Sequence, residues 1–365
     1  MYRSLFSRDY FASREQFRRL VGRSGSSAHI SYTHPWARGP QGERLTTDVA
    51  VFGAKGADRL LIVGSGTHGI EGYCGAGAIA HVLQSGLTDR LPANLQLVLI
   101  HALNSYGFAW ERRTDEWNVD LNRNFVEFSA RVFEANPVYD DIHPHLVPGD
   151  LYGPLHEAGD EAIRSLMKRL GADVYHETVS RGQHRYADGL FYGGASPTWS
   201  RIWFETMLRY QWMRGKKRVG MIDIHSGLGP CGHGELLLSR DAVEHRRALD
   251  WFGEDAETWS KSSKGPVAVD SLGGSIRQPF FRWAHLAEMT VAGLEFGTVP
   301  LEVEREALRL DNLLHLHSQP GTPEWSKIKA LMRAAFFVET EEWCRQIAEQ
   351  TLLRVRQAIA GLSRS

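Results

Sequence analysis

The chain has 365 residues and a mass of 41.1 kDa, which is enough for one large α/β domain or two smaller domains with a sizeable core. Its composition, with 42% hydrophobic and 23% charged residues, is ordinary for a soluble globular protein. The formal net charge of -1 supplies no overall field that would attract nucleic acid or an anionic membrane. We therefore exclude nucleic acid and membrane as partners and expect a small molecule or a peptide, while the oligomeric state stays open.

The predicted elements follow a strand, helix, strand order from the start of the core. The first hundred residues predict a helix, a loop, two strands, a small-residue helix and a third strand, at 10–22, 24–43, 47–53, 58–64, 71–85 and 95–104. The second strand is a continuous apolar run, typical of a strand that is buried on both faces of a sheet. This order predicts an α/β fold with a mostly parallel or mixed central sheet flanked by helices, and with sites at the carboxyl ends of the strands.

The rest of the chain predicts further helices and the remaining strands. Helices are expected around 158–180 and 199–214 and over most of 300–360, strands at 218–229, 233–240 and 289–298, and a functional loop at RYADGLFYGGASPTWS, 185–200. No Pro, Gly or Ser-rich linker divides the sequence. We expect one catalytic domain over 1–365, with a core at about 45–300, an N-terminal helix and loop over 1–45 and a C-terminal helical region over 300–365.

Cysteine content and the N-terminal sequence predict the compartment. The three cysteines are too few and too far apart for a disulfide framework, which favours a reducing environment. The first 20 residues are interrupted by charges and lack the apolar segment of a signal peptide. No run of about 18 uncharged apolar residues occurs. We expect a cytoplasmic protein.

The stretch LLIVGSGTHGIEGYCG, 60–75, contains a glycine pattern that two kinds of site share. Gly64, Gly66 and Gly69 fit the G-x-G-x-x-G of a dinucleotide loop. Such a loop also needs an acidic residue at the end of the next strand, to hold the ribose hydroxyls. Here that strand, LQLVLIHALN, ends in His and Asn. A nucleotide-binding oxidoreductase is therefore the weaker hypothesis.

The same turn carries two residues with the chemistry of metal ligands. His68 and Glu71 are three residues apart, and His225 ends another apolar strand in DIHSGLG. Imidazole nitrogens and carboxylate oxygens suit zinc, and three protein ligands leave one position for water, as in a catalytic site. Asp223 lies two residues before His225 and could orient its ring. The structural alternatives are a helix-capping Glu71 beside a polar turn and an Asp223 paired with an unrelated donor.

Together these motifs resemble the zinc carboxypeptidase superfamily. That family carries H-x-x-E, an N-R pair, a distant His and a late Glu in this order, and the matching residues here are His68 and Glu71, Asn122 and Arg123 in NVDLNRNF, His225 in IDIHSG, and Glu295 in GLEFGT. The combination is similar to a little-characterised bacterial branch of unknown function. The DLNR element also resembles the aspartoacylase and succinylglutamate desuccinylase branch. The resemblance implies a carboxypeptidase-like, phosphorylase/hydrolase-like fold.

The resemblance also implies a cofactor and a reaction. One zinc ion per chain would be held by His68, Glu71 and His225. The reaction would be cleavage of an amide bond in a peptide or N-acyl amino acid with a free carboxylate, by metal-activated water. Glu295 would be the general base. A degenerate homologue that binds a metal or ligand without turnover is the alternative, and carboxypeptidase and deacylase activities stay equally open.

Two further roles follow from the resemblance. Asn122 and Arg123 would hold the substrate carboxylate, since a planar guanidinium can donate two charge-assisted hydrogen bonds to it. An arginine shortly before this pair would polarise the scissile carbonyl. Arg112 and Arg113 both qualify, and Arg113 is preferred. Without the neighbouring motifs, the same segment would be interpreted as a solvated loop with internal ion pairs.

The sequence departs from the family at one position. Carboxypeptidases place a tyrosine, which closes over bound substrate, between the third metal ligand and the catalytic glutamate, and no Tyr occurs here from 226 to 294. Tyr186 or Tyr192 in the 185–200 loop could take this role, or the role is absent. Both could equally be core aromatic residues.

Overall fold

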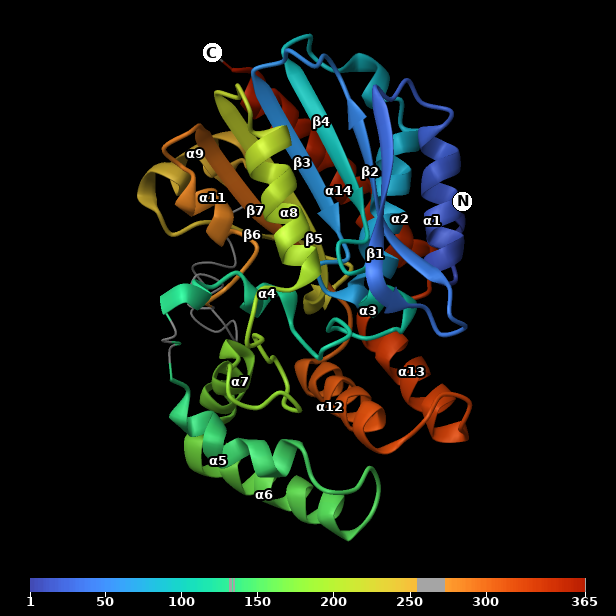
Figure 1. The fold of residues 1–365 in the computed structure, drawn as a ribbon, viewed down its shortest axis with the longest axis vertical. Coiled ribbons are helices and arrows are strands. Elements are labelled where there is room, and N and C mark those ends of the chain that lie inside the picture. Colours follow the sequence, from blue (N-terminus) through green and yellow to red (C-terminus); the bar gives the residue numbers. More distant parts are fainter. Residues whose placement is uncertain (131–132, 134, 255–272, 365) are drawn as a thin grey trace.

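The computed structural model describes residues 1–130, 133, 135–254 and 273–364, and a mixed sheet forms its centre (Figure 1). The strands are β1 (Ala28–Arg38), β2 (Arg44–Phe52), β3 (Arg59–Ser65), β4 (Leu95–His101), β5 (Arg218–Cys231), β6 (Gly234–Leu237) and β7 (Glu288–Gly297). Their order across the sheet is β1-β2-β4-β3-β5-β7-β6. The central strands β4, β3, β5 and β7 are parallel, whereas β1, β2 and β6 pair antiparallel. The predicted α/β class with a mixed sheet is confirmed.

Helices cover both faces of this sheet. The α-helices are α1 (Tyr10–Val21), α2 (Gly72–Gln84), α3 (Ser105–Ala109), α4 (Leu121–Asn124), α5 (Pro137–Leu146), α6 (Pro154–Leu170), α7 (Ala172–Arg181), α8 (Trp199–Met207), α9 (Ala242–Phe252), α11 (Gln278–Arg282), α12 (Leu301–His317), α13 (Pro323–Phe336) and α14 (Glu341–Ser363). Side chains of α1, α2, α9 and α14 form one apolar core with the sheet, and those of α8 and α11 form a second. Figure 1 accordingly shows α8 in front of the strands and α2 and α14 behind them.

Strand β3 lies in the interior of the sheet. Residues 60–65 are all buried, because the strand lies between β4 and β5 and is covered by helices on both faces. A strand in this position needs apolar side chains on both of its faces. The continuous apolar run in the sequence therefore predicted it correctly.

The loop predicted over 24–43 is wrong, because it contains strand β1. The outward-facing side chains of β1 are mostly exposed, and among the described strands it lies at the edge of the sheet, next to β2. Pro35 falls in the part of the strand where the pairing register with β2 shifts, as is usual for proline in an edge strand. Backbone pairing rather than side-chain burial holds this strand, so it leaves little periodicity in the sequence.

The helix predicted around 158–180 is two helices. Gly171 has a φ of 88° and separates α6 from α7. Because only glycine adopts such a backbone readily, the chain can change direction here.

Figure 1 shows α4, α7 and α12 beyond the end of the sheet at which β3 and β5 terminate. The helical third of the chain therefore lies at the edge where sites were expected. The expectation of a single catalytic domain over 1–365 stays a prediction.

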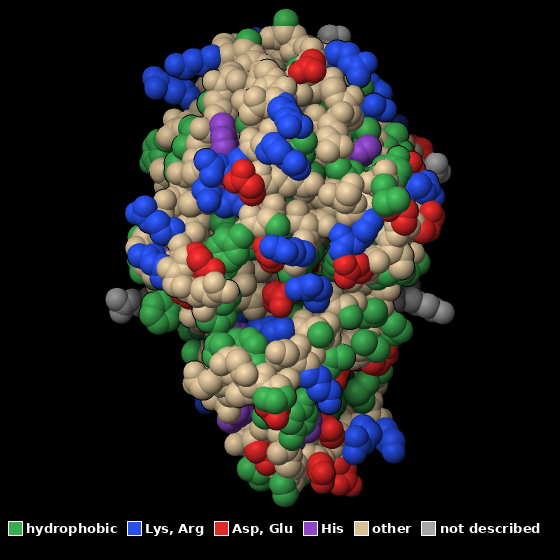
Figure 2. Space-filling model, turned by 90° about the vertical axis from the view of Figure 1, so that its right-hand side faces the viewer, with side chains coloured by type: hydrophobic (Ala, Val, Ile, Leu, Met, Phe, Trp, Pro, Cys, Tyr) green, Lys and Arg blue, Asp and Glu red, His purple; other side chains and the backbone are tan. Residues whose placement is uncertain are grey.

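The surface carries mixed charges. On the face shown in Figure 2, acidic and basic side chains are interspersed, in keeping with the net charge of -1. Among the described helices, none combines the length and the apolar character that crossing a lipid bilayer requires.

Candidate metal and catalytic site

The glycine-rich turn after β3 carries His68 and Glu71. Gly66 has a φ of 66°, which turns the chain at the end of the strand. Glu71 ends a short 3-10 turn that begins at Gly69. A Cβ atom at Gly69 would lie 2.1 Å from the carbonyl carbon of Gly107, so this glycine permits close packing of two backbone segments. The glycines therefore shape the turn that presents His68 and Glu71.

The sheet register places His225 and Glu295 side by side. The two residues are directly paired across the parallel strands β5 and β7. Strand β5 also pairs with β3, where Ser65 lies opposite Ile224. The carboxyl ends of three neighbouring strands thus bring together residues that are more than 200 positions apart in the chain.

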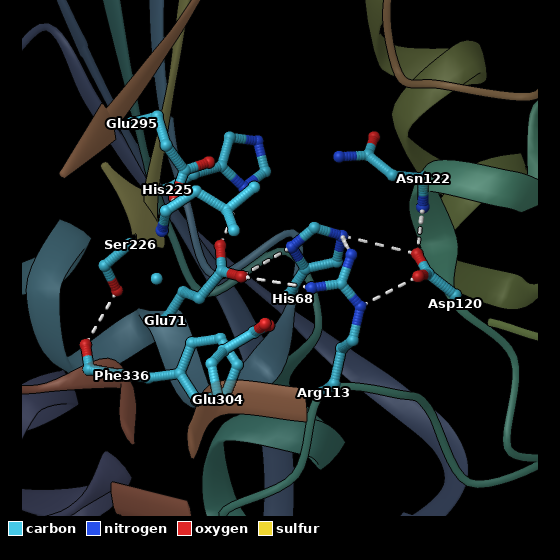
Figure 3. Close-up of polar contacts among 12 residues, drawn as sticks. His68, Glu71, Arg113, Asp120, Asn122, His225, Ser226, Glu295, Glu304 and Phe336 are labelled. Atoms are coloured by element: carbon cyan, nitrogen blue, oxygen red, sulfur yellow. Dashed lines mark hydrogen bonds and ion pairs between the residues drawn. The ribbon is translucent and has the colours of Figure 1, made fainter. Parts of the chain in front are cut away.

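The three predicted metal ligands converge. One ligand atom from each of His68, Glu71 and His225 lies within 4.8 Å of the other two, and all three residues are buried. His68 Nδ1 lies 2.8 Å from Glu71 Oε1, and His225 Nδ1 lies 2.7 Å from Glu71 Oε2 (Figure 3). Two imidazole nitrogens and a carboxylate form a donor set that fits zinc. Other first-row divalent ions accept the same donors.

The second nitrogen of each ring faces a carboxylate. His225 Nε2 lies 2.6 Å from Asp223 Oδ2, and Asp223 Oδ1 accepts a hydrogen bond of 2.8 Å from Thr67. His68 Nε2 lies 3.3 Å from Asp120 Oδ1. A metal-binding histidine commonly donates its other N–H to a carboxylate, which fixes the ring orientation. Asp223 thus lies where the sequence predicted it, whereas Asp120 was not singled out.

The charges of the cluster are tightly coupled. Burial raises the pKa of Glu71, but the adjacent His68 and His225 outweigh it and lower the pKa to about 2. Burial likewise raises the pKa of Asp120, and Arg113 and His68 outweigh it, so that the pKa lies well below its usual value. Glu71 and Asp120 are therefore ionised. An ionised carboxylate is the form that binds a metal ion.

Replacing Asp223 with Asn is expected to weaken zinc binding by about 10- to 100-fold, because the His225 ring loses its charged hydrogen-bond partner. Competition with a fluorescent zinc chelator measures the affinity. Asp89→Asn, at an exposed position in the turn after α2, is the matched control and should leave the affinity unchanged. Equal affinities in both variants would show that Asp223 does not orient His225.

Glu295 is a buried acid beside this cluster. The residue is 9% exposed, and its carboxylate accepts a hydrogen bond of 3.2 Å from the backbone N–H of Leu228. Burial, together with the nearby charge of Glu71, raises the pKa of Glu295 to about 8. A carboxyl group with a pKa near neutrality can both accept and donate a proton at physiological pH.

The two candidate arginines point to different places. Arg113 lines the same cavity as the cluster. Its Nε donates a hydrogen bond of 2.8 Å to Asp120, and its Nη1 lies 3.4 Å from Glu71 (Figure 3). Its Nη2 lies 2.7 Å from His68 Nε2. Arg112 instead donates to Asn118 at 2.9 Å. The structure brings Arg113 to the cluster and turns Arg112 away.

Asn122 and Arg123 also line the cavity. Arg123 is 4% exposed and donates to backbone oxygens, from Nε to Ser180 at 3.0 Å and from Nη1 to Asn122 at 2.9 Å. Its Nη2 donates to the Ser180 carbonyl as well. Burial lowers the pKa of Arg123 to about 10, the charge of Asp120 opposes this shift, and the charges of Arg113 and Arg305 add to it. Arg123 is therefore a buried cation near Asp120, and its direct hydrogen bonds go to backbone oxygens.

The cavity contains residues that the sequence did not single out. The described residues enclose about 910 Å³, part of it open to solvent. Phe191 lines this cavity, whereas neither Tyr186 nor Tyr192 is among the described residues that do. Tyr186 stacks on His143, with ring centroids 3.9 Å apart. The 185–200 loop therefore contributes a phenylalanine, and neither tyrosine takes the closing position in this structure.

Two neighbouring charged residues of α12 complete the wall. Glu304 is buried, and its Oε2 lies 3.2 Å from Nη1 of Arg305. Both side chains line the cavity. The guanidinium of Arg305 also lies over the Phe191 ring, 4.9 Å from its centroid. The acidic first turn of α12 was visible in the sequence, but nothing local showed that it enters the site.

Several solved structures are similar to the chain. A candidate metallopeptidase from Shewanella amazonensis is 14% identical, with 85% of this chain and 94% of that chain covered and a TM-score of 0.41. A candidate succinylglutamate desuccinylase/aspartoacylase family protein from the same organism is 17% identical, with 79% and 70% covered and a TM-score of 0.37. Carboxypeptidase A from Helicoverpa armigera is 13% identical, with 90% and 73% covered and a TM-score of 0.44. These are the classes of protein that the sequence motifs resemble.

The sequence comparisons show the family. A search of curated proteins found no match. One family profile, described as "Protein of unknown function (DUF2817)", matches residues 6–350. This match confirms the expected branch of unknown function. Because it spans nearly the whole chain, the protein belongs to the DUF2817 family.

Proposed function

We propose that the protein is a zinc-dependent hydrolase that cleaves an amide bond in a peptide or N-acyl amino acid with a free carboxylate. The observation that carries this proposal is the convergence of His68, Glu71 and His225 beside the buried Glu295. The three ligand side chains would hold one zinc ion. Bound zinc would supply a Lewis acid that polarises a carbonyl and lowers the pKa of water toward neutrality.

Glu295 is the proposed general base. It would take a proton from the attacking water and pass it to the leaving nitrogen. Its place across the strand pair from His225 and its raised pKa support this role, since proton transfer is most efficient when the pKa of the base is near the working pH.

Arg113 is the proposed group that stabilises negative charge on the carbonyl oxygen. Its Nε is anchored by Asp120, so the guanidinium is held in one orientation before substrate binds. A donor that is fixed in advance stabilises developing charge without reorganisation. Asp120 would therefore position both Arg113 and His68.

Arg123 and Asn122 are the proposed site for the substrate carboxylate. A guanidinium has five N–H donors, and the three backbone contacts of Arg123 leave two for a ligand. A carboxylate would pair directly with these free N–H groups through charge-assisted hydrogen bonds. The Asn122 carboxamide is oriented by the backbone N–H of Ile276, which donates 3.0 Å to its oxygen.

Arg123→Met is expected to raise KM for a free-acid substrate by about 30-fold or more, because losing one partner of a buried charge pair costs about 2 kcal/mol or more. KM for the methyl ester of the same substrate should change little. Initial rates with the acid and the ester measure both values. Arg181→Met is the control, because this half-buried arginine of α7 pairs with Glu177 and is not among the described residues that line the cavity. An unchanged preference for the acid in Arg123→Met would assign the carboxylate to another residue.

The proposed function is tested with paired substrates. Zinc-loaded protein is incubated with N-acetyl amino acids and dipeptides, each as the free acid and as the methyl ester, and the released amine is quantified. Zinc-dependent cleavage of the free acids is expected, with the preferred class separating deacylase from carboxypeptidase activity. Failure of the folded, zinc-loaded protein to cleave either class would contradict the proposal.

A further inference from the structure

A second cavity lies between α6, α7 and α12, next to the candidate site. It encloses about 730 Å³, part of it open to solvent. Met167 from α6, Val179 from α7 and Leu190 from the 185–200 loop give it apolar walls. Arg305 lines both this cavity and the one that contains the metal-ligand cluster.

Two buried polar groups in this second cavity have no hydrogen-bond partner. His176 is 4% exposed, and neither of its ring nitrogens has a partner among the described residues. Nε of Arg305 likewise has no hydrogen-bond partner among the described residues. The other two nitrogens of this guanidinium are paired: Nη2 donates a hydrogen bond of 2.6 Å to Ser180 Oγ, and Nη1 donates one to Glu304. Leaving a buried polar group without a partner is unfavourable, because the group has lost its hydrogen bonds to water. A bound molecule that pairs with these groups would remove that cost.

The chemistry of the cavity selects its ligand. Arg305 Nε can only donate, so it requires an acceptor. Burial lowers the pKa of His176, so the ring is neutral at physiological pH and offers one donor and one acceptor. The apolar walls match a hydrocarbon chain. The other charged residues that line the cavity are Asp160, Arg164, Glu302, Glu306 and Arg309, so acidic and basic side chains balance around it.

We propose that this cavity binds an amphipathic monocarboxylate, with its carboxylate at Arg305 and His176 and its hydrocarbon chain against Met167, Val179 and Leu190. Water molecules could satisfy the two polar groups separately, but the apolar walls would then face water, which is unfavourable. The proposed site does not depend on zinc or on amide hydrolysis, so it stands or falls independently of the proposed function.

The test is isothermal titration calorimetry of the full chain with decanoate. We expect one decanoate per chain, and much weaker binding of acetate, which lacks the chain, and of decylamine, which lacks the carboxylate. His176→Phe removes both ring nitrogens with little change of volume, and Met167→Trp fills the apolar end. Each should weaken binding at least about tenfold, which corresponds to about 1.4 kcal/mol, because His176→Phe removes a hydrogen-bond partner of the carboxylate and Met167→Trp occupies the space of the hydrocarbon chain. Val174→Phe, at an exposed position of α7, is the matched control and should bind as the wild type does.

Three results would overturn the proposal. The first is no decanoate binding to the wild-type protein, in which case water fills the cavity. The second is binding that Arg123→Met abolishes and His176→Phe does not, which would place decanoate in the metal-site cavity. The third comes from the wild-type protein alone, and applies if the variants do not fold. A diazirine analogue of decanoate should label residues between 163 and 179 or between 302 and 309, and labelling confined to other segments excludes the site.

Discussion

Replacing Glu295 with Gln is expected to reduce kcat for amide hydrolysis by about a thousandfold, with the zinc content unchanged. Glutamine has nearly the same size and can keep the contact with the Leu228 N–H through its amide oxygen, but it cannot accept the proton of the attacking water. General base catalysis of this kind contributes about 10²- to 10⁴-fold. Steady-state kinetics together with metal analysis of the same preparation measures both quantities.

Glu235→Gln is the matched control for this experiment. Glu235 is a buried acid on the adjacent strand β6, directly paired with Glu295, and it is not among the described residues that line the cavity. Burial raises its pKa to about 7, so it shares the titration range expected of a general base. We expect kcat to change less than about threefold in this variant. If Glu235→Gln loses activity and Glu295→Gln keeps it, the base has been assigned to the wrong strand.

The double variant His68→Ala, His225→Ala is expected to lose the zinc ion, about one per chain, that the three-ligand site predicts for the wild type. Two of three protein ligands are removed, and the remaining Glu71 cannot hold the ion alone. Elemental analysis of untagged protein gives the metal content. The same variant should lose the thermal stabilisation that added zinc gives the wild type, which is about 4 kcal/mol at a thousandfold excess over Kd.

The control for metal binding is His285→Ala, at an exposed position. It should keep the wild-type zinc content, because metal binding by a surface histidine alone is weak and lost during purification. A wild-type protein that is folded but contains no zinc, even after zinc is supplied, would contradict the hydrolase mechanism. Equal zinc content in the wild type and the double variant would place the ion elsewhere in the chain.

The sequence by itself determined the local parts of the site. The apolar runs before the glycine turn and before His225 show two strands that are buried on both faces, and the glycines show a tight turn after the first. Because the carboxyl ends of parallel strands share one edge of a sheet, these local patterns were sufficient to bring His68, Glu71 and His225 together. Their residue types then predict a site for a first-row divalent metal ion, of which zinc is one.

Only the tertiary structure decided the surroundings of these ligands. Arg112 and Arg113 are adjacent in sequence, but their side chains point in different directions. Arg113 donates to Asp120 in the site, whereas Arg112 donates to Asn118. Glu304 and Arg305 enter the wall because α12 packs against the end of the sheet, more than 200 residues after His68. Local periodicity reports burial and turns within about ten residues, whereas these contacts depend on how distant helices and loops pack together. The edge strand β1 escaped prediction for a related reason, since pairing with β2 stabilises it and its side chains carry no pattern of burial.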